Sequence, residues 1–428
     1  MSQKLVIVGS GFAGFWAALS ARRLISLNPD KSAAGIEVVV IAPDANLVMR
    51  PRLYEPNPAS MSEPVDDVYR ACGVRFVHGI VDTIRPANHE IEMVDRAGAR
   101  ATMSYDKLIL AAGSRVVRPD IPGLREHAFC VDQIEDAVQL DRHLHSLVSV
   151  APSKARNTVV VCGGGFTGIE VATELPGRLR ALFGEGTDLR VVVVERNKNI
   201  GNDLGAGPRP HVLKAFADLG VESKVGTGVV GVDAGGVTLS TGERIETLTA
   251  VWTAGVAATP LTGQVSDDRD SFGRLRVDSV LRVPTAPDVI AAGDAASADA
   301  DGAGHCSKMS CQHAGPLGKV AGYNAAAELL GIPTMDYTQP IYRACVDLGA
   351  AGAVVGEGWD VQVRYTGDRA KPVKQFINSA LIYPPRPDAA HAFSVADPAY
   401  DGSDPTIDHP TLQQFLIDNG FAGQVPPV

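Results

Sequence analysis

The sequence KLVIVGSGFAG fills residues 4–14, close to the amino terminus. Its first half is apolar and rich in β-branched residues, which predicts a buried parallel strand. Its second half has the spacing G-x-G-x-x-G, and the apolar periodicity that follows predicts a helix to about Ser26. Strand, glycine turn and helix in this order form the first unit of a doubly wound α/β sheet.

Each glycine of this turn has its own physical reason. Gly9 permits the sharp turn out of the strand, Gly11 lets a pyrophosphate approach the main chain, and Gly14 lets the helix pack close to the strand. The helix N-terminus then points free N–H groups at the phosphates. We therefore expect a dinucleotide at this turn, with Phe12 and Ala13 lining the same site.

The same arrangement occurs a second time. A strand over residues 158–161, the turn GGGFTG at 163–168 and a helix through Leu175 repeat it. Each copy is followed by a hairpin whose last strand ends in Ala-Gly, at Ala112-Gly113 and Ala254-Gly255. Two chance turns would not carry matching hairpins, so we interpret the repeat as two dinucleotide-binding domains. Ordinary structural turns are the alternative interpretation.

The stretch VIAAGD, residues 289–294, is a third apolar strand and ends in Gly293-Asp294. An acidic side chain at the mouth of a parallel strand is well placed to bind cofactor hydroxyl groups. A helix cap is the alternative role for Asp294.

Composition limits the remaining function classes. A chain of 428 residues predicts about two or three domains. Its net charge of −10 disfavours nucleic acid, because an acidic chain repels phosphate backbones. The cysteines form no C-x-x-C pair and no metal-ligand spacing, so we expect reduced thiols and no bound metal. No apolar run reaches the ~18 residues of a membrane span, which favours a cytoplasmic protein.

Together these motifs resemble the two-dinucleotide-binding-domain flavoproteins, the pyridine nucleotide-disulfide oxidoreductase superfamily. YDKLILAAGS at 105–114 and WTAG at 252–255 add to this likeness. Within the superfamily, VMRPRLYE at 48–55 and CVDLG at 345–349 are similar to type II NADH dehydrogenases. The cysteine-pair motif of the disulfide reductases is absent from the sequence.

The resemblance implies an α/β fold with two Rossmann-like domains. FAD would bind residues 1–120 and 271–335, and NADH would bind the inserted residues 121–270. Residues 336–428 would form a smaller C-terminal α+β domain near the other face of the flavin.

The resemblance also implies the cofactor contacts. For FAD they are Gly9, Gly11, Phe12, Ala13, Gly14, Asp44, Arg50, Val81, Ala112, Gly113, Gly293, Asp294 and Cys311. For NADH they are Gly163, Gly165, Phe166, Thr167, Gly168, Glu195 and Gly255. Ala42 replaces the acidic residue expected after the second FAD strand, and Asp44 is the substitute for its ribose contact.

Glu195 ends the strand after the second glycine turn. A carboxylate there accepts hydrogen bonds from ribose hydroxyls and repels a 2′-phosphate, which favours NADH over NADPH. Arg196 and Lys198 act against this preference. A solvated strand end is the alternative interpretation of Glu195.

Three further residues are candidates for the chemistry. The resemblance places Glu170 near the nicotinamide amide, although a carboxylate in a first helical turn is also stabilised by the helix dipole. Gln312 could hold a quinone carbonyl through its amide. His313 could supply a proton to the acceptor or be structural, and Cys311 could touch the flavin or be an inert buried thiol.

The C-terminal region offers an amphipathic helix. Val373, Phe376, Ile377, Ala380 and Leu381 share one face, whereas Lys371, Lys374 and Asn378 lie off it. Packing on the protein core is the default for such a face, and docking on a membrane surface is the alternative. The tail beyond Arg386 is acidic and holds a short helix at 411–419, so we expect at most weak peripheral membrane contact.

The sequence therefore predicts an FAD-dependent NADH dehydrogenase whose partners are NADH and a small quinone-like acceptor. A soluble reductase for an iron–sulfur protein and a poorly turning-over FAD/NADH redox sensor are the alternatives. The oligomeric state stays open, with a homodimer as one arrangement.

Overall fold

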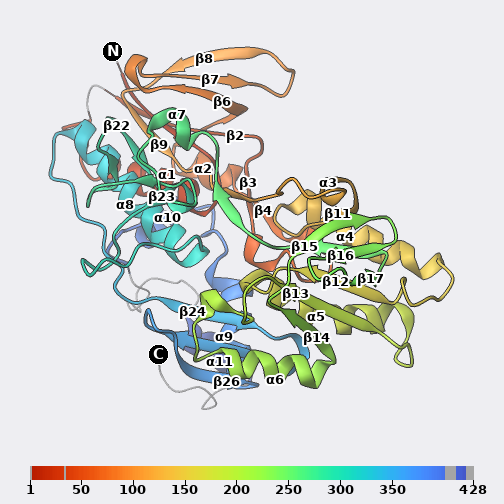
Figure 1. Ribbon diagram of the computed structural model, residues 1–428. Coiled ribbons are helices and arrows are strands. Elements are labelled where there is room, and N and C mark those ends of the chain that lie inside the picture. Colours follow the sequence, from red (N-terminus) through yellow and green to blue (C-terminus); the bar gives the residue numbers. More distant parts are fainter. Residues whose placement is uncertain (1, 33–34, 401–410, 421–428) are drawn as a thin grey trace.

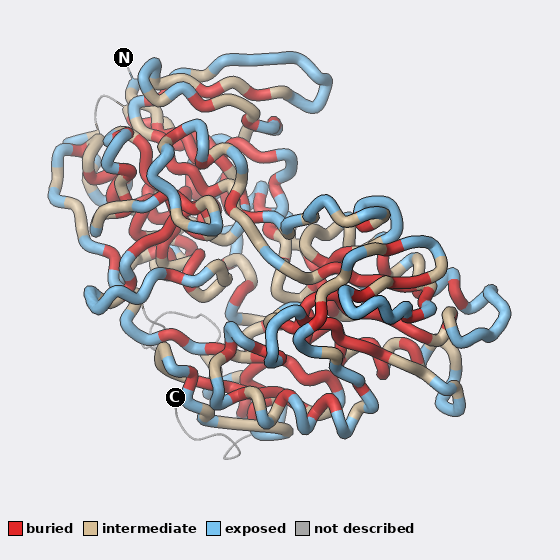
Figure 2. The backbone as a smooth tube through the Cα atoms, in the orientation of Figure 1, coloured by how far each residue is buried: buried red, intermediate tan, exposed pale blue. Residues whose placement is uncertain are grey.

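The computed structural model describes residues 2–32, 35–400 and 411–420, and Figure 1 shows two sheet-containing lobes with a third part below them. Its strands and helices carry the labels of that figure. The buried main chain in Figure 2 follows the central strands of both lobes, where the apolar runs of the sequence lie.

The first unit is built on a six-stranded sheet in the order β21-β22-β9-β1-β2-β5, parallel except for β21. Its strands are β1 (Gln3–Val8), β2 (Ile36–Ala42), β5 (Arg75–His78), β9 (Lys107–Leu110), β21 (Arg282–Val283) and β22 (Ala286–Ala291). An antiparallel sheet of β6 (Ile80–Arg85), β7 (Glu90–Val94) and β8 (Arg100–Ser104) accompanies it.

Helices α1 (Phe12–Ser26) and α8 (Cys311–Leu330) pack closely together in this unit. Glycines in α8 make the close approach possible. A Cβ on Gly318 would lie 2.2 Å from the Ala13 carbonyl oxygen, and one on Gly322 would lie 2.0 Å from that of Ala17. The start of α8 is thereby held beside the first glycine turn.

The second unit repeats the first. Its parallel sheet has the order β11-β18-β12-β13-β14, which matches β22-β9-β1-β2-β5 position by position. The strands are β11 (Ala128–Phe129), β12 (Thr158–Cys162), β13 (Arg190–Glu195), β14 (Val221–Val225) and β18 (Thr249–Trp252). Its helices are α4 (Ile134–Ser146), α5 (Phe166–Phe183) and α6 (Arg209–Leu219), and its antiparallel strands are β15 (Val229–Asp233), β16 (Gly236–Leu239) and β17 (Arg244–Glu246).

The two units are joined by β10 (Ser114–Val116), which pairs antiparallel with β19 (Val256–Ala258). The boundary at residue 270 stays a prediction, and α7 (Thr262–Val265), which precedes it, packs on the first unit (Figure 1). The Gln264 side chain accepts a hydrogen bond from the Ile84 N–H at 2.7 Å and donates one to the Asp82 carbonyl at 3.0 Å.

The C-terminal part consists of an antiparallel sheet of β24 (Arg343–Asp347), β25 (Ala353–Glu357) and β26 (Gln362–Gly367) with helices on it. α9 (Lys371–Phe376) continues into one π-helical turn, η8 (Ile377–Leu381). α11 (Leu412–Asp418) packs on α9. α10 (Ala389–Val395), assigned above to the C-terminal domain, instead packs on α1 and α2 (Asp66–Ala71) of the first unit.

Short elements complete the described chain. They are β3 (Asn46–Val48), β4 (Ser62–Pro64), α3 (Leu124–His127), β20 (Leu275–Arg276), β23 (Ala296–Ser297) and the 3₁₀ turns η1 (Arg50–Arg52), η2 (Pro58–Ser60), η3 (Pro86–Asn88), η4 (Leu147–Ser149), η5 (Asn202–Leu204), η6 (Gly293–Ala295) and η7 (Gly349–Ala351). Within residues 2–32, 35–400 and 411–420, no helix is both long and apolar enough to cross a membrane.

The amphipathic helix at 373–381 forms, and its polar side is also packed against protein. Val373 and Phe376 are buried as expected, yet Lys374 and Asn378 are buried too, at 4% and 6% exposure. α9 is covered on both faces, because α5 of the second unit and the segment after η1 lie against its polar side. Its lysines therefore bind carboxylates inside the protein.

Candidate functional site

The first glycine turn has one open position. A Cβ on Gly9, whose φ is 107°, would lie 2.4 Å from the Ala111 carbonyl oxygen, and one on Gly14 would lie 1.9 Å from that of Gly9. A Cβ on Gly11 would meet nothing within 4 Å among the described atoms. In the described residues, no side chain caps the first turn of α1, so its N–H groups are free to bind a phosphate. The turn fits a dinucleotide.

Arg50 and Asp294 meet beside this turn, although 244 positions separate them. The Arg50 guanidinium donates to the Asp294 carboxylate at 3.4 Å and to the Ser114 hydroxyl at 3.2 Å. Ser114 in turn donates to Asp294, and Asp132 forms an ion pair with Arg50. Sequence reasoning missed Ser114 and Asp132. Ser114 could have been predicted as a site residue, because it directly follows Ala112-Gly113 in the sequence.

Other predicted FAD residues lie around the same sheet. Ala112 and Gly113 follow β9, and Gly113 has a φ of 69° with open space beside it. The Asp44 carboxylate is exposed and forms an ion pair with Arg96 of the β7–β8 turn. Val81 is buried in β6 within the core of the first unit.

The second glycine turn has the same construction. Gly163 has a φ of 123°, and a Cβ on Gly168 would lie 1.9 Å from the Gly163 carbonyl oxygen. Gly165 is open except for the Asp203 carboxylate, 3.5 Å from its added Cβ. The Glu195 carboxylate lies at the turn, where it accepts hydrogen bonds at 2.8 Å from the N–H groups of Gly164 and Asn197. Phe166 and Thr167 open α5, and Gly255 precedes β19.

A buried ion pair forms where the three parts of the chain meet. Lys374 Nζ on α9 lies 2.8 Å from Glu170 Oε1 on α5, and their side chains are 4% and 5% exposed. The Asp347 N–H donates to the same Glu170 oxygen at 3.1 Å. Lys374 Nζ also lies 5.6 Å from the ring centroid of Tyr54 in the first unit and 5.9 Å from that of Phe166 in the second glycine turn.

The charges of this pair are set by opposing effects. Burial raises the pKa of Glu170 to about 7, although Lys374 and the Asp347 N–H lower it. Burial acts to lower the pKa of Lys374, but Glu170, Cys345 and Asp347 together outweigh it and the pKa is raised. Lys374 therefore stays protonated at neutral pH, and Glu170 holds a proton more readily than an ordinary carboxyl, at a site closed to bulk water.

The segment Cys311-Gln312-His313 begins α8. Gln312 Oε1 accepts from the Arg343 N–H at 3.2 Å, and Gln312 Nε2 donates to the Ile341 carbonyl at 3.4 Å, so its amide binds the segment that leads into β24. His313 is fully buried, and burial with Lys308 and Arg274 lowers its pKa to about 4. A neutral buried imidazole fits the structural alternative better than a proton donor. Burial raises the pKa of the Cys311 thiol.

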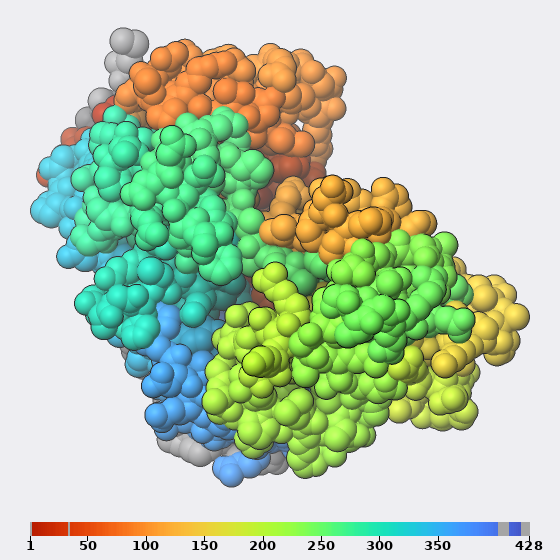
Figure 3. Space-filling model, viewed as in Figure 1, coloured from red at the N-terminus to blue at the C-terminus, as the bar shows by residue number. Residues whose placement is uncertain are grey.

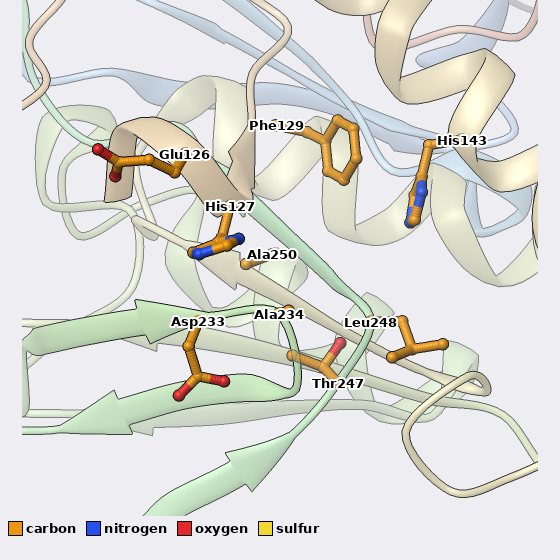
Figure 4. A pocket seen from close by; sticks show the side chains of 9 residues that line it. All are labelled: Glu126, His127, Phe129, His143, Asp233, Ala234, Thr247, Leu248 and Ala250. Carbon is orange, nitrogen blue, oxygen red and sulfur yellow. The ribbon is translucent and has the colours of Figure 1, made fainter. Parts of the chain in front are cut away.

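Figure 3 shows a hollow between the two lobes, with the early residues of the chain visible at its base. A separate pocket of about 220 Å³ lies in the second unit (Figure 4). Its lining comes from α3, β11, α4, the β15–β16 turn and the segment from the end of β17 into β18, and it includes none of the predicted cofactor residues. The candidate site is therefore the junction between the two glycine turns and α9.

The sequence pattern of one family, the pyridine nucleotide-disulphide oxidoreductases, matches residues 3–318. The chain belongs to this family. An NADH dehydrogenase-like protein of Mycobacterium tuberculosis is 44% identical over 391 residues, covering 89% of this chain and 94% of that protein. The demethylphylloquinone reductase of Synechocystis is 27% identical, covering 82% of this chain and 86% of that protein.

Solved structures of the pyridine nucleotide-disulphide oxidoreductase fold agree with the described architecture. NDH2 from Plasmodium falciparum, in complex with NADH, superposes with a TM-score of 0.71 at 15% identity, covering 92% of this chain and 97% of that one. The sulfide:quinone oxidoreductase of Aquifex aeolicus has a TM-score of 0.72 at 14% identity, covering 93% of each chain. The predicted family and fold are thus confirmed.

Proposed function

We propose that this chain is an FAD-dependent NADH dehydrogenase that passes electrons to a quinone-type acceptor. One observation carries the proposal: a single buried ammonium, Lys374 Nζ, lies near the rings of Tyr54 and Phe166. It therefore stands where the FAD unit and the NADH unit converge. The names of the M. tuberculosis and Synechocystis relatives, an NADH dehydrogenase-like protein and a quinone reductase, agree with the proposal.

FAD, when bound, supplies the hydride and electron transfer, and the chain supplies position and protons. The main chain at Gly11 and at Gly165 binds the two pyrophosphates. Glu195 accepts hydrogen bonds from the NADH ribose. Lys374 holds a proton at Nζ for the acceptor, and the buried surroundings exclude water.

Nucleotide choice tests the role of Glu195. The unchanged protein should reduce its flavin faster with NADH than with NADPH, because a buried carboxylate opposes a 2′-phosphate. Glu195→Ser should narrow that preference about tenfold, which corresponds to ~1.4 kcal/mol. Anaerobic stopped-flow bleaching of the flavin measures both rates. Glu243→Ser, an exposed carboxylate paired with Lys224, is the matched control and should leave the ratio unchanged. An unaltered ratio in Glu195→Ser would assign nucleotide choice to Arg196 and Lys198.

The acceptor site is tested through Gln312. Gln312→Leu should slow oxidation of the prereduced enzyme by menadione about tenfold, since a lost hydrogen bond costs about 0.5–1.5 kcal/mol. Flavin reduction by NADH should be unaffected, because Gln312 lies on α8 and outside the second unit. Gln362→Leu, on the exposed edge of β26, serves as the control. Equal slowing of both half-reactions would remove Gln312 from the acceptor site.

We further propose a cytoplasmic location with at most weak peripheral membrane contact. Its support is the inward orientation of Lys374, which is engaged by Glu170 and not available to anionic lipid.

A further inference from the structure

A carboxylate lies beside the second glycine turn, and none lies at the matching position of the first. The Asp203 Oδ2 atom is 3.5 Å from the place that a Cβ on Gly165 would take. Gly165 is the N-cap of α5, whose free N–H groups would bind the pyrophosphate of NADH. At Gly11 no described atom lies within 4 Å of the added Cβ. The two turns therefore share one construction and differ in the charge beside it.

The segment that carries Asp203 is fixed against the second turn. The Gly201 N–H donates to the Gly164 carbonyl at 2.8 Å, so the main chain of the segment is hydrogen-bonded to the turn itself. Ile200 and Leu204, on either side of Asp203, are buried at 2% and 1% exposure. Moving the segment away would expose these two apolar side chains, so Asp203 stays beside the expected position of the pyrophosphate.

The charge of Asp203 is not neutralised by a neighbour. In the part of the chain that the structure describes, no ion pair or hydrogen bond engages its carboxylate. In the first unit, by contrast, Asp44 follows the second strand and is paired with Arg96. Burial raises the pKa of Tyr342 to about 12, and Cys311 and Asp203 add to the rise. The field of Asp203 therefore reaches the junction where the nucleotide would lie.

The two carboxylates of the second turn face different parts of a bound nucleotide. Glu195 accepts hydrogen bonds from main-chain N–H groups at the turn and can accept more from ribose hydroxyls. A pyrophosphate diester carries two negative charges and has no proton to donate at pH 7. Asp203 therefore cannot bind it through a hydrogen bond, and like charges at this separation repel each other.

We propose that Asp203 weakens the binding of the nicotinamide nucleotide by repelling its pyrophosphate, and that it thereby speeds the release of NAD⁺. The inference rests on the proposed function. FAD stays bound through successive turnovers, and its turn at Gly11 has no such carboxylate. NADH must enter and NAD⁺ must leave in each turnover, so lower affinity suits the second turn.

The experiment compares ligands with and without a pyrophosphate in the FAD-loaded protein. Asp203→Asn should lower the Kd for NAD⁺ and for ADP-ribose about tenfold at low salt, which corresponds to ~1.4 kcal/mol. Isothermal titration calorimetry measures both values. Adenosine has no phosphate, so its Kd, measured by competition with ADP-ribose, should stay the same. Asp203→Glu keeps the charge and should keep the weaker binding.

Two further measurements separate local repulsion from the net charge of the chain. Asp188→Asn removes an exposed carboxylate before β13, at the end of the strand away from the glycine turn, and should leave all three Kd values unchanged. In about 1 M KCl, where the Debye length is about 3 Å, the gain in Asp203→Asn should shrink to less than about threefold. At low salt the dissociation rate of NAD⁺ should fall together with its Kd.

The sign of the effect decides the outcome. An unchanged or higher Kd for ADP-ribose in Asp203→Asn would overturn the proposal, because the carboxylate would then be indifferent to the nucleotide or would bind a ribose hydroxyl. An equal gain in Asp188→Asn, or an equal gain with adenosine, would overturn it too. Failure of NADH to bleach the flavin of the unchanged protein would instead count against the proposed function. The titrations with ADP-ribose require no turnover and test Asp203 separately.

Discussion

Lys374→Met should lower the free energy of unfolding by about 3–5 kcal/mol, because it leaves the Glu170 carboxylate buried without its partner. Water cannot solvate the Glu170 carboxylate in place of Lys374, since the Glu170 side chain is only 5% exposed. Glu170→Gln combined with Lys374→Met should recover most of the loss, because the buried charge is then gone while the amide oxygen still accepts from the Asp347 N–H. Urea unfolding followed by circular dichroism measures these differences.

The decrease in the free energy of unfolding caused by Lys374→Met should also depend on pH. Burial raises the pKa of Glu170 to about 7, and removal of Lys374 takes away an effect that lowers it. A carboxyl whose folded pKa exceeds its unfolded value costs stability only as the pH rises above the unfolded value of 4.5. The loss should therefore be small near pH 5 and grow toward pH 8. Lys214→Met, in an exposed pair, should cost less than about 1 kcal/mol at either pH. Equal losses in the two lysine variants would contradict the buried-pair description.

Gly11→Val should abolish FAD binding while leaving the fold intact. The added side chain meets nothing within 4 Å among the described atoms, so it fills only the space where the pyrophosphate is expected. The flavin content of the purified protein should fall to less than about a tenth of the unchanged level, a loss of more than ~1.4 kcal/mol in binding. Absorbance at the flavin band against protein concentration gives the ratio.

The control for this substitution is Gly177→Val in α5, where the added side chain also meets no described atom within 4 Å. It should purify with its full flavin content. Gly14→Val is expected to disturb the fold of the first turn as well as FAD binding. Its Cβ would lie 1.9 Å from the Gly9 carbonyl oxygen, so the turn itself must deform. Full flavin content in Gly11→Val would remove the first turn from the cofactor site.

The two glycine turns were predictable because their chemistry is local. Gly9 and Gly14 are required by contacts within the turn and with the neighbouring strand, and such requirements leave a fixed spacing in the sequence. The strand order of the second unit followed from the repeat. The contact between α7 and strand β6 could not be predicted, because the hydrogen bonds of Gln264 to β6 have no signature in the sequence.

Lys374 could not be found by periodicity. Its helix shows an apolar face, and the opposite face of an amphipathic helix normally meets water. Here that face meets Glu170, which lies 204 positions earlier in another domain. The residue types did point to an ion-pair cluster. Two lysines lie one turn apart in the predicted helix, and the carboxylates Glu170 and Asp347 had already been noted as a candidate residue and as part of the CVDLG motif. The choice between the two roles of His313 could not be made from the sequence, because its burial and lowered pKa depend on residues of other elements.

The distance of 204 positions between Glu170 and Lys374 also has a consequence for synthesis on the ribosome. Translation adds roughly 5–20 residues per second, so Glu170 leaves the ribosome roughly 10–40 s before Lys374, which neutralises it. During that interval the nascent protein has an open, unneutralised junction. A chain cut short before α9 would therefore contain both glycine turns but would lack Lys374, and the Glu170 carboxylate would have no cation beside it.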